Sequence, residues 1–281
     1  MNASSTPSRS VALQRRNLQG RGVSRAFSDL IEGFAAWQIW GNLGWNDIRT
    51  RYRRSMIGPF WITISMAVTV LALGFLYARL FRIDIEAFLP MLALGFILWG
   101  YFAPTLNECC TIFVANQNFI KQATIPLTVY INQAIFRQLI TFGHNFIIYF
   151  GMVIFLSIPI GWVTLWAIPA FILVTITIFG AGLFLAVVCA RFRDIPNIVQ
   201  NILQIGFYLS PILWSAELLP ERAFFLTWNP FYYLIYVIRM PLLGEAPTLD
   251  IWFGTGVITL ISLTLGLVSF LLMRRRIAYW V

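Results

Sequence analysis

The chain has 281 residues, of which 59% are hydrophobic and only 11% are charged, and its formal net charge is +9. Soluble domains of this length do not have this composition, so a large soluble core is excluded. The basic residues flank apolar stretches, where they orient a membrane protein and attract anionic lipid, so no nucleic acid is expected as a partner.

The head of the chain, residues 1–24, is rich in serine and arginine and contains no acidic residue. It does not resemble a secretory signal peptide, because the first apolar stretch begins only near residue 57 and is longer than an apolar signal core of about 7–15 residues. We interpret residues 1–24 as a disordered cytoplasmic tail and residues 25–281 as one transmembrane domain.

A segment between the tail and the first apolar stretch has apolar side chains at roughly helical intervals, with polar residues between them. This pattern predicts an N-terminal amphipathic helix lying in the inner membrane interface. A cytoplasmic helix docked on a partner is the alternative. The apolar positions are Phe27, Leu30, Ile31, Phe34, Trp37, Trp45 and Ile48.

Six long apolar stretches follow, over residues 57–81, 88–113, 130–156, 163–189, 195–215 and 250–273. A helix needs about 20 apolar residues to cross a bilayer, whereas a barrel strand needs about 10. Backbone groups in lipid must also satisfy their own hydrogen bonds. The sequence therefore predicts an all-α, polytopic membrane protein with six transmembrane helices.

The charges of the connecting segments alternate in sign along the chain. Basic residues dominate the head, the second-to-third link, the fourth-to-fifth link and the end of the chain, whereas the other links are neutral or acidic. By the positive-inside rule, both termini are cytoplasmic, and we expect a multi-pass protein of the bacterial inner membrane.

The fifth stretch carries a polar stripe. Its polar side chains are spaced by four, three and four residues, which places them on one helical face. Polar side chains at this depth face the bundle interior or water, so the stripe either lines a pathway or bonds to a neighbouring helix. The residues are Asn197, Asn201, Gln204 and Tyr208.

Glu108, which follows Asn107 in the second stretch, is the only acid inside a predicted span apart from Asp250, the first residue of the sixth stretch. A carboxylate within the membrane is a candidate functional group by default. Because it lies towards the cytoplasmic end of its span, an ordinary ion pair or a water-filled vestibule is the favoured interpretation.

The link between the fifth and sixth stretches, residues 216–247, is divided by prolines into apolar pieces too short to span a membrane. This pattern predicts short re-entrant helices on the outer side, which are tolerated where they pack on protein or line an aqueous space. A small external cap is the alternative.

Several kinds of chemistry are missing from the chain. Lys121 is the only lysine, and no GxxxxGK[ST] phosphate-binding loop surrounds it. No catalytic dyad or metal-ligand cluster is recognisable, and the cysteines, Cys109, Cys110 and Cys189, do not suggest a disulfide framework. We expect no enzyme, no metal site and no cofactor in this chain, so the energy for uphill transport must come from another subunit.

Six short motifs in order along the chain resemble the permease subunits of type-two ABC exporters, in the branch that exports O-antigen, capsular and teichoic polysaccharides. They are RYRRSMIGPFW (51–61), NFIKQATIPL (118–127), RFRDIP (191–196), SPILW (210–214), WNPFYY (228–233) and RMPLLG (239–244). The resemblance covers residues 27 to 276.

This resemblance implies a homodimeric permease that works with two copies of a cytoplasmic ATP-binding subunit, which uses ATP and magnesium. The second-to-third link would act as a coupling helix that receives motion from the ATPase, through Asn118, Phe119, Lys121, Thr124 and Pro126. The re-entrant segment would lie near the exit, with Pro220, Trp228, Pro230, Tyr232, Tyr233, Arg239 and Pro241.

The resemblance further implies a pore between two copies, lined by the first, second and fifth spans. Sugar rings have apolar C–H faces and polar edges, so a passage for glycan needs aromatic surface, scattered amides and little charge. The candidate lining residues are Phe60, Trp61, Phe75, Phe96, Trp99, Phe102, Asn107, Glu108, Asn197, Asn201, Gln204 and Tyr208.

We therefore expect an ATP-driven export permease for a lipid-linked polysaccharide, with membrane lipids as further partners. An exporter of a small amphipathic compound and a membrane scaffold that transports nothing are the alternatives.

Overall fold

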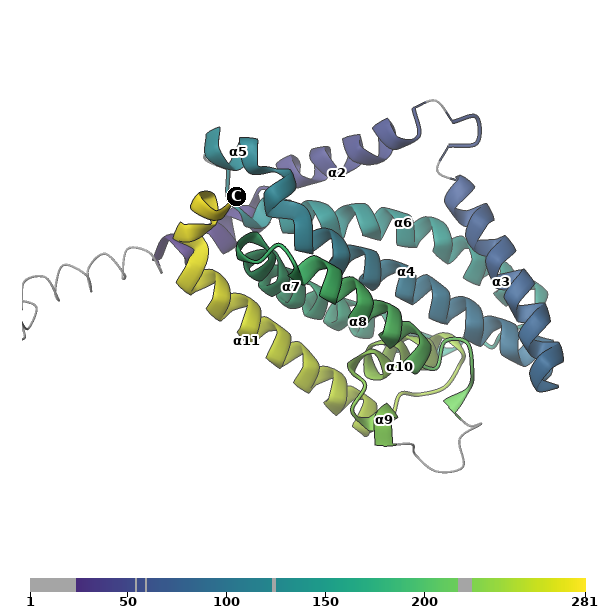
Figure 1. Ribbon diagram of the computed structural model, residues 1–281. Helices are drawn as coiled ribbons and strands as arrows, with labels where there is room; N and C mark the ends of the chain where they lie inside the picture. The colour runs from purple at the N-terminus through teal and green to yellow at the C-terminus, as the bar shows by residue number, and fades with distance from the viewer. Residues whose placement is uncertain (1–23, 54, 59, 123–124, 217–223) are drawn as a thin grey trace, which may run out of the picture.

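The computed structural model describes residues 24–53, 55–58, 60–122, 125–216 and 224–281 (Figure 1). The predicted tail, apart from Ser24, lies outside these residues. The regular elements of the described chain are helices. They are residues 24–35, α2 (Trp37–Arg51), α3 (Phe60–Phe81), α4 (Ile85–Ala115), α5 (Gln117–Gln122), α6 (Thr128–Phe155), the 3₁₀ helix η1 (Trp162–Trp166), α7 (Ala167–Arg191), α8 (Ile195–Leu209), α9 (Phe224–Thr227), α10 (Pro230–Leu242) and α11 (Leu249–Trp280).

Five helical segments in the described chain are long and apolar enough to cross a membrane: α3, α4, α6, η1 with α7, and α11. Each coincides with one of the predicted spans. The prediction of an all-helical polytopic membrane protein is confirmed.

The predicted span over 195–215 is shorter in the structure. Its helix, α8, has 15 residues and is about 22 Å long, less than the hydrocarbon thickness of about 30 Å. Pro211 disfavours helical geometry in the residue before it, and Ser210 is extended, with ψ 145°. The count of six full-length spans therefore stays a prediction.

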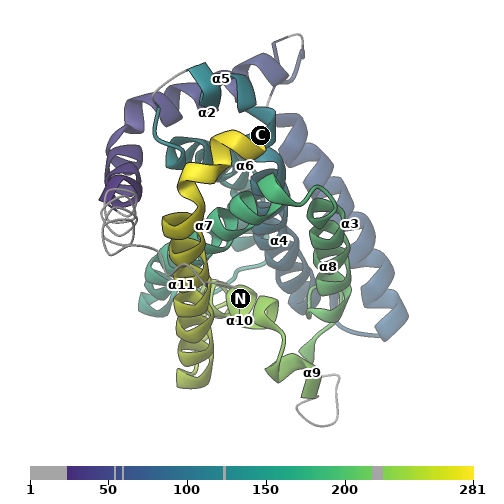
Figure 2. The same ribbon diagram turned by 60° about the vertical axis from the view of Figure 1, so that its left-hand side comes forward.

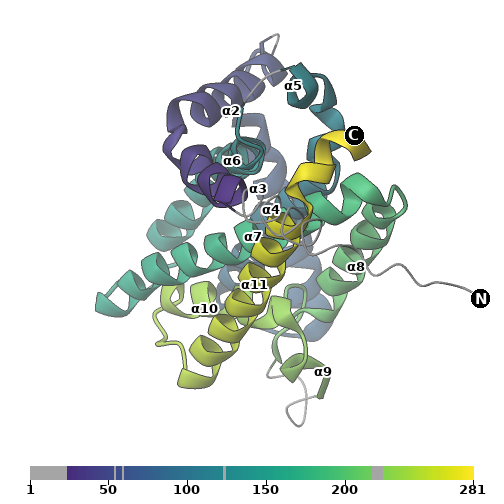
Figure 3. The ribbon, with the colours of Figure 1, turned by 90° about the vertical axis from the view of Figure 1, so that its left-hand side faces the viewer.

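The core lies along α4 and α7, which pack against each other and against α6, while α7 also packs against α11 (Figures 2 and 3). Leu94, Leu98, Ile131, Ile178 and Leu183 are among its fully buried side chains. By contrast, α3 has few buried residues and lies at the edge of the bundle. Large apolar side chains of α3, such as Val68, Leu71 and Leu76, are therefore exposed in a single copy of the chain.

The two ends of the bundle carry different elements. The end that holds α2, α5 and the end of α11 is called the inner end here, and the end that holds α9 and α10 is called the outer end (Figure 1). The 3₁₀ helix η1 contacts α10 and so belongs to the outer end. At the inner end, Lys121 Nζ donates to the Val281 carbonyl at 2.6 Å. The predicted second-to-third link, which contains α5, and the residue that follows α11 therefore meet at the inner end.

The amphipathic segment is helical but interrupted at Ala36, between residues 24–35 and α2. Most of its large apolar side chains, including Phe34, Trp37 and Trp45, are exposed, whereas Ile48 is buried. Its acids Asp29 and Asp47 instead bond to the bundle. A helix in the membrane interface needs its apolar side chains to face lipid and its polar side chains to find polar partners. The arrangement is consistent with the predicted interfacial helix, which stays a prediction.

Candidate functional site

α8 has three distinct faces. Val199, Leu203 and Gly206 are buried against α4, α7 and Phe231. The predicted polar stripe forms a second face, and all four of its residues are exposed: Asn197, Asn201, Gln204 and Tyr208. The third face is apolar and also exposed, with Ile198, Ile202, Ile205 and Leu209.

In the described part of the chain, the polar stripe therefore does not pack against another helix. Amide side chains facing acyl chains would lose hydrogen bonds to water without replacing them. The face has to be covered by water or by polar groups of a second molecule, whereas the neighbouring isoleucine face suits lipid. Packing on another helix of the same chain is not seen among the described residues, and the interpretation of the stripe as the lining of a pathway stays a prediction.

The predicted aromatic residues divide into two groups. Phe60, Trp61 and Phe75 on α3 are more than half exposed. The second group belongs to one aromatic cluster at the junction of α4, α8 and α10, which consists of Phe96, Trp99, Phe102, Phe207 and Phe231. Within this cluster Trp99 is half-buried, and its ring centroid lies 5.6 Å from that of Phe207 on α8.

Phe102, a candidate lining residue, is 1% exposed and packs inside this aromatic cluster. Its ring packs between α4 and α10 and is not presented on the surface of the chain. Phe96 is half-buried and contacts Phe207 at 5.5 Å.

Glu108 forms an ion pair with Arg137 on α6, so the ion-pair interpretation is confirmed. Arg137 also binds Asp47 on α2 at 2.6 Å, and Gln133 donates to the same carboxylate at 2.8 Å. The network joins α2, α4 and α6 at the inner end. Asn107, beside it, is half-buried.

The predicted coupling link forms the short helix α5, in which no residue is buried. Asn118, Phe119 and Lys121 are exposed, and Phe119 has 64% of its surface accessible. Pro126 is half-buried, and Thr124 lies outside the described residues. An exposed aromatic ring on a helix at the inner end is a surface suited to contact with another subunit.

Asp29, which the sequence did not single out, holds the segment that follows this link. Its carboxylate accepts hydrogen bonds from the Leu127 and Thr128 amides, each at 3.1 Å, and binds Arg274 Nη2 at 2.6 Å. The Asp29 side chain is fully buried. One carboxylate therefore joins the amphipathic segment, the start of α6 and α11.

The predicted re-entrant segment includes α10, which runs from inside the bundle to its outer end. Near its start, Phe231 contacts Trp99 at 5.0 Å, more than three turns into α4. After its end, Gly244 packs against Pro159 in the outer link between α6 and α7. With Leu234 to Leu242 mostly buried, α10 is part of the bundle and not an external cap.

Arg239 is 2% exposed and fixes α10 to the end of α8. Its Nη1 donates to the Pro211 carbonyl at 2.7 Å, and its guanidinium lies 4.1 Å from the Tyr236 ring centroid. Asn229 adds a hydrogen bond to Ser210 Oγ at 3.0 Å. Pro241 is buried, Trp228 is exposed, and Pro220 lies outside the described residues.

Comparison with known proteins identifies relatives of this chain. It is similar to the O-antigen export system permease protein RfbA of Klebsiella pneumoniae, with 26% identity over 188 residues, 66% of this chain and 72% of that protein. It is similar to the protein of the same name from Myxococcus xanthus, with 22% identity over 191 residues, again 66% and 72%. The family described as ABC-2 type transporter matches residues 24–243. With most of its length matched, the chain belongs to the ABC-2 type transporter family.

Proposed function

We propose that the chain is the permease subunit of an ATP-driven exporter that moves a lipid-linked polysaccharide across the bacterial inner membrane. The O-antigen export permeases similar to it support this substrate class. The observation that carries the proposal is the exposed polar face of α8, a surface that lipid would not tolerate.

A second copy of the chain completes the path. We propose that the two polar α8 faces and the exposed aromatic side chains of α3 enclose a wet passage when two copies meet. Such a passage offers amides and rings with little charge, so it contacts sugar rings without trapping a charged group. The large exposed apolar surface of α3 supports the same pairing.

Energy comes from two copies of a cytoplasmic ATP-binding subunit that uses ATP and magnesium. The exposed α5 helix receives its motion, and the Asp29 and Arg137 networks carry that motion into α6, α11 and α4. This arrangement requires the inner end of the bundle to face the cytoplasm.

The function is tested by removing the polar face. Asn201→Ala with Gln204→Ala and Tyr208→Ala should lower polysaccharide export at least about tenfold, because water-ordering groups and an aromatic surface are lost from the passage. The measurement is surface glycan in a strain whose own copy is deleted, with membrane levels of the permease measured alongside.

The matched control is Ile202→Ala with Ile205→Ala, on the exposed apolar face of the same helix. This control should keep export near the wild-type level. Normal export by the polar-face variant would contradict the proposal and favour a scaffold. Normal surface glycan in the deletion strain, with loss of export of a small amphipathic compound, would instead identify the alternative substrate.

A separate prediction concerns α5. Phe119→Ala should leave the permease folded, because this ring is 64% exposed, but should reduce transport-coupled ATP hydrolysis by about fivefold to tenfold through loss of an aromatic anchor. ATPase activity of the reconstituted complex is measured. Phe155→Ala, at an exposed phenylalanine near the other end of the bundle, serves as control, and equal activity of both variants would remove α5 from the coupling path.

A further inference from the structure

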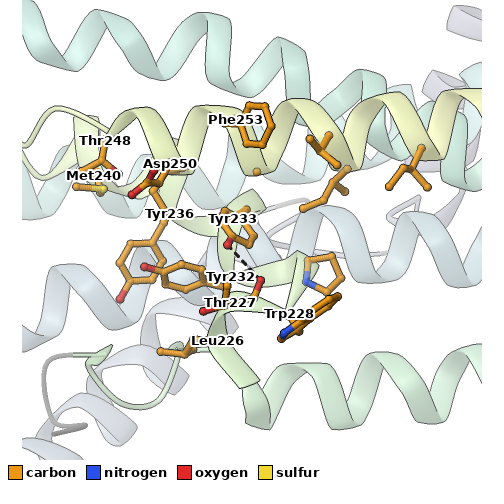
Figure 4. Close-up of a pocket in the computed structure, with 16 residues that line it drawn as sticks. Leu226, Thr227, Trp228, Tyr232, Tyr233, Tyr236, Met240, Thr248, Asp250 and Phe253 are labelled. Carbon is orange, nitrogen blue, oxygen red and sulfur yellow. Dashed lines mark hydrogen bonds between the residues drawn. The ribbon is translucent and has the colours of Figure 1, made fainter. Parts of the chain in front are cut away.

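A cavity of about 710 Å³ lies at the outer end, between α9 and α10 on one side and α11 on the other (Figure 4). Its volume falls within the range of about 300–1,000 Å³ that is usual for small-molecule sites. It is separate from the polar face of α8. α10 points Phe231 towards Trp99 and α8, whereas its tyrosines line the cavity.

Three tyrosines of α10 form the aromatic wall. The ring centroid of Tyr232 lies 4.4 Å from that of Tyr236 and 5.3 Å from that of Tyr233. The hydroxyl of Tyr233 donates to the Thr227 carbonyl at 3.1 Å, which fixes its ring. A Cβ at Gly254 on α11 would collide with the same ring, so this glycine makes room for it.

The cavity combines aromatic rings with oxygen acceptors. Among the described residues that line it, Asp250 is a carboxylate and Thr227 and Thr248 carry hydroxyl groups. This lining matches a neutral ligand with an apolar ring face and several hydroxyl groups, since carboxylate and threonine oxygens accept hydroxyl protons.

We infer that this cavity is a saccharide-binding site that takes neutral sugar units of the exported glycan at the outer end. The inference rests on the proposed function and adds a second contact point, on the far side of α10 from the α8 face. Sugar rings stack on Tyr232 and Tyr233, and their hydroxyls donate to Asp250. Weak binding at this site would hinder the glycan from slipping back between transport steps.

The test places the photo-crosslinking amino acid p-benzoylphenylalanine at single aromatic positions of the whole transporter in glycan-producing cells. Trp228 lines the cavity and is 73% exposed, and Tyr208 lies on the polar face of α8. Phe155, 85% exposed on α6 and outside the cavity, is the control. Illumination should attach periodate-sensitive glycan to the permease at positions 208 and 228 but not at 155.

The outcomes separate the two proposals. Glycan at position 208 with none at 228, or equal labelling at 155 and 228, would overturn the saccharide site and leave the function standing. Crosslinking at 228 to phospholipid or to a second permease would overturn the site as well. Absence of glycan at 208 and 228, with normal surface glycan in a strain lacking the chain, would refute the proposed function.

A pair of variants then tests the aromatic wall. In the protein with the probe at position 228, Tyr232→Ala should reduce the glycan adduct about fivefold to tenfold, whereas Tyr232→Phe should keep most of it, because the ring face is retained. Folded protein is quantified in both. An unchanged adduct in Tyr232→Ala would rule out stacking on this ring.

Discussion

Replacing Asp29 with asparagine is expected to lower the free energy of unfolding of the permease by about 3 kcal/mol. The Asp29 carboxylate is fully buried, and the groups that hydrogen-bond to it are N–H and O–H donors. An amide nitrogen in its place would point a donor at these groups and leave a cation without its counter-charge. The donors are Leu127 N, Thr128 N, Thr128 Oγ1, Arg274 Nε and Arg274 Nη2.

The measurement is denaturant or thermal unfolding of the purified protein in detergent, followed by tryptophan fluorescence. Glu32→Gln, an exposed acid on the same helix, is the matched control and should change stability by less than about 0.5 kcal/mol. If Asp29→Asn unfolds like the control, the amphipathic segment is not held by this carboxylate.

Gly266→Val is expected to cost a similar amount, about 3 kcal/mol, because α7 and α11 touch through their backbones. A Cβ at Gly266 would collide with the Gly180 carbonyl oxygen, and one at Gly180 would come within 2.7 Å of the Leu263 amide. Neither contact is with a flexible side chain, so the helices would have to separate. The packing that orders the core would be lost along this crossing.

Gly256→Val tests the explanation on the same helix. A Cβ at Gly256 meets no atom within 4 Å, so this variant adds the same volume where there is space. Folded yield and unfolding midpoint in detergent are compared for the two variants. Equal losses in both would mean that valine destabilises α11 itself, and that the close crossing is not responsible.

The sequence alone was sufficient for the long elements and for the face of α8. Apolar length determines where a chain crosses a membrane, and this property is local, so the helices α3, α4, α6, α7 and α11 coincide with predicted stretches. The spacing of Asn197, Asn201, Gln204 and Tyr208 depends only on helical periodicity, and the four side chains do share one exposed face.

The contacts between these elements could not be read from the sequence, because they join residues far apart in the chain. Asp29 was one polar residue of an amphipathic pattern until Arg274 and the start of α6 were placed against it. The tyrosine cavity likewise needs Gly254 of α11 opposite α10. Local hydrophobicity determined the spans and the polar face of this protein. Only the tertiary structure decided which residues join the helices at the inner end and which residues line the cavity beside α10, because these depend on packing and pairing between distant segments.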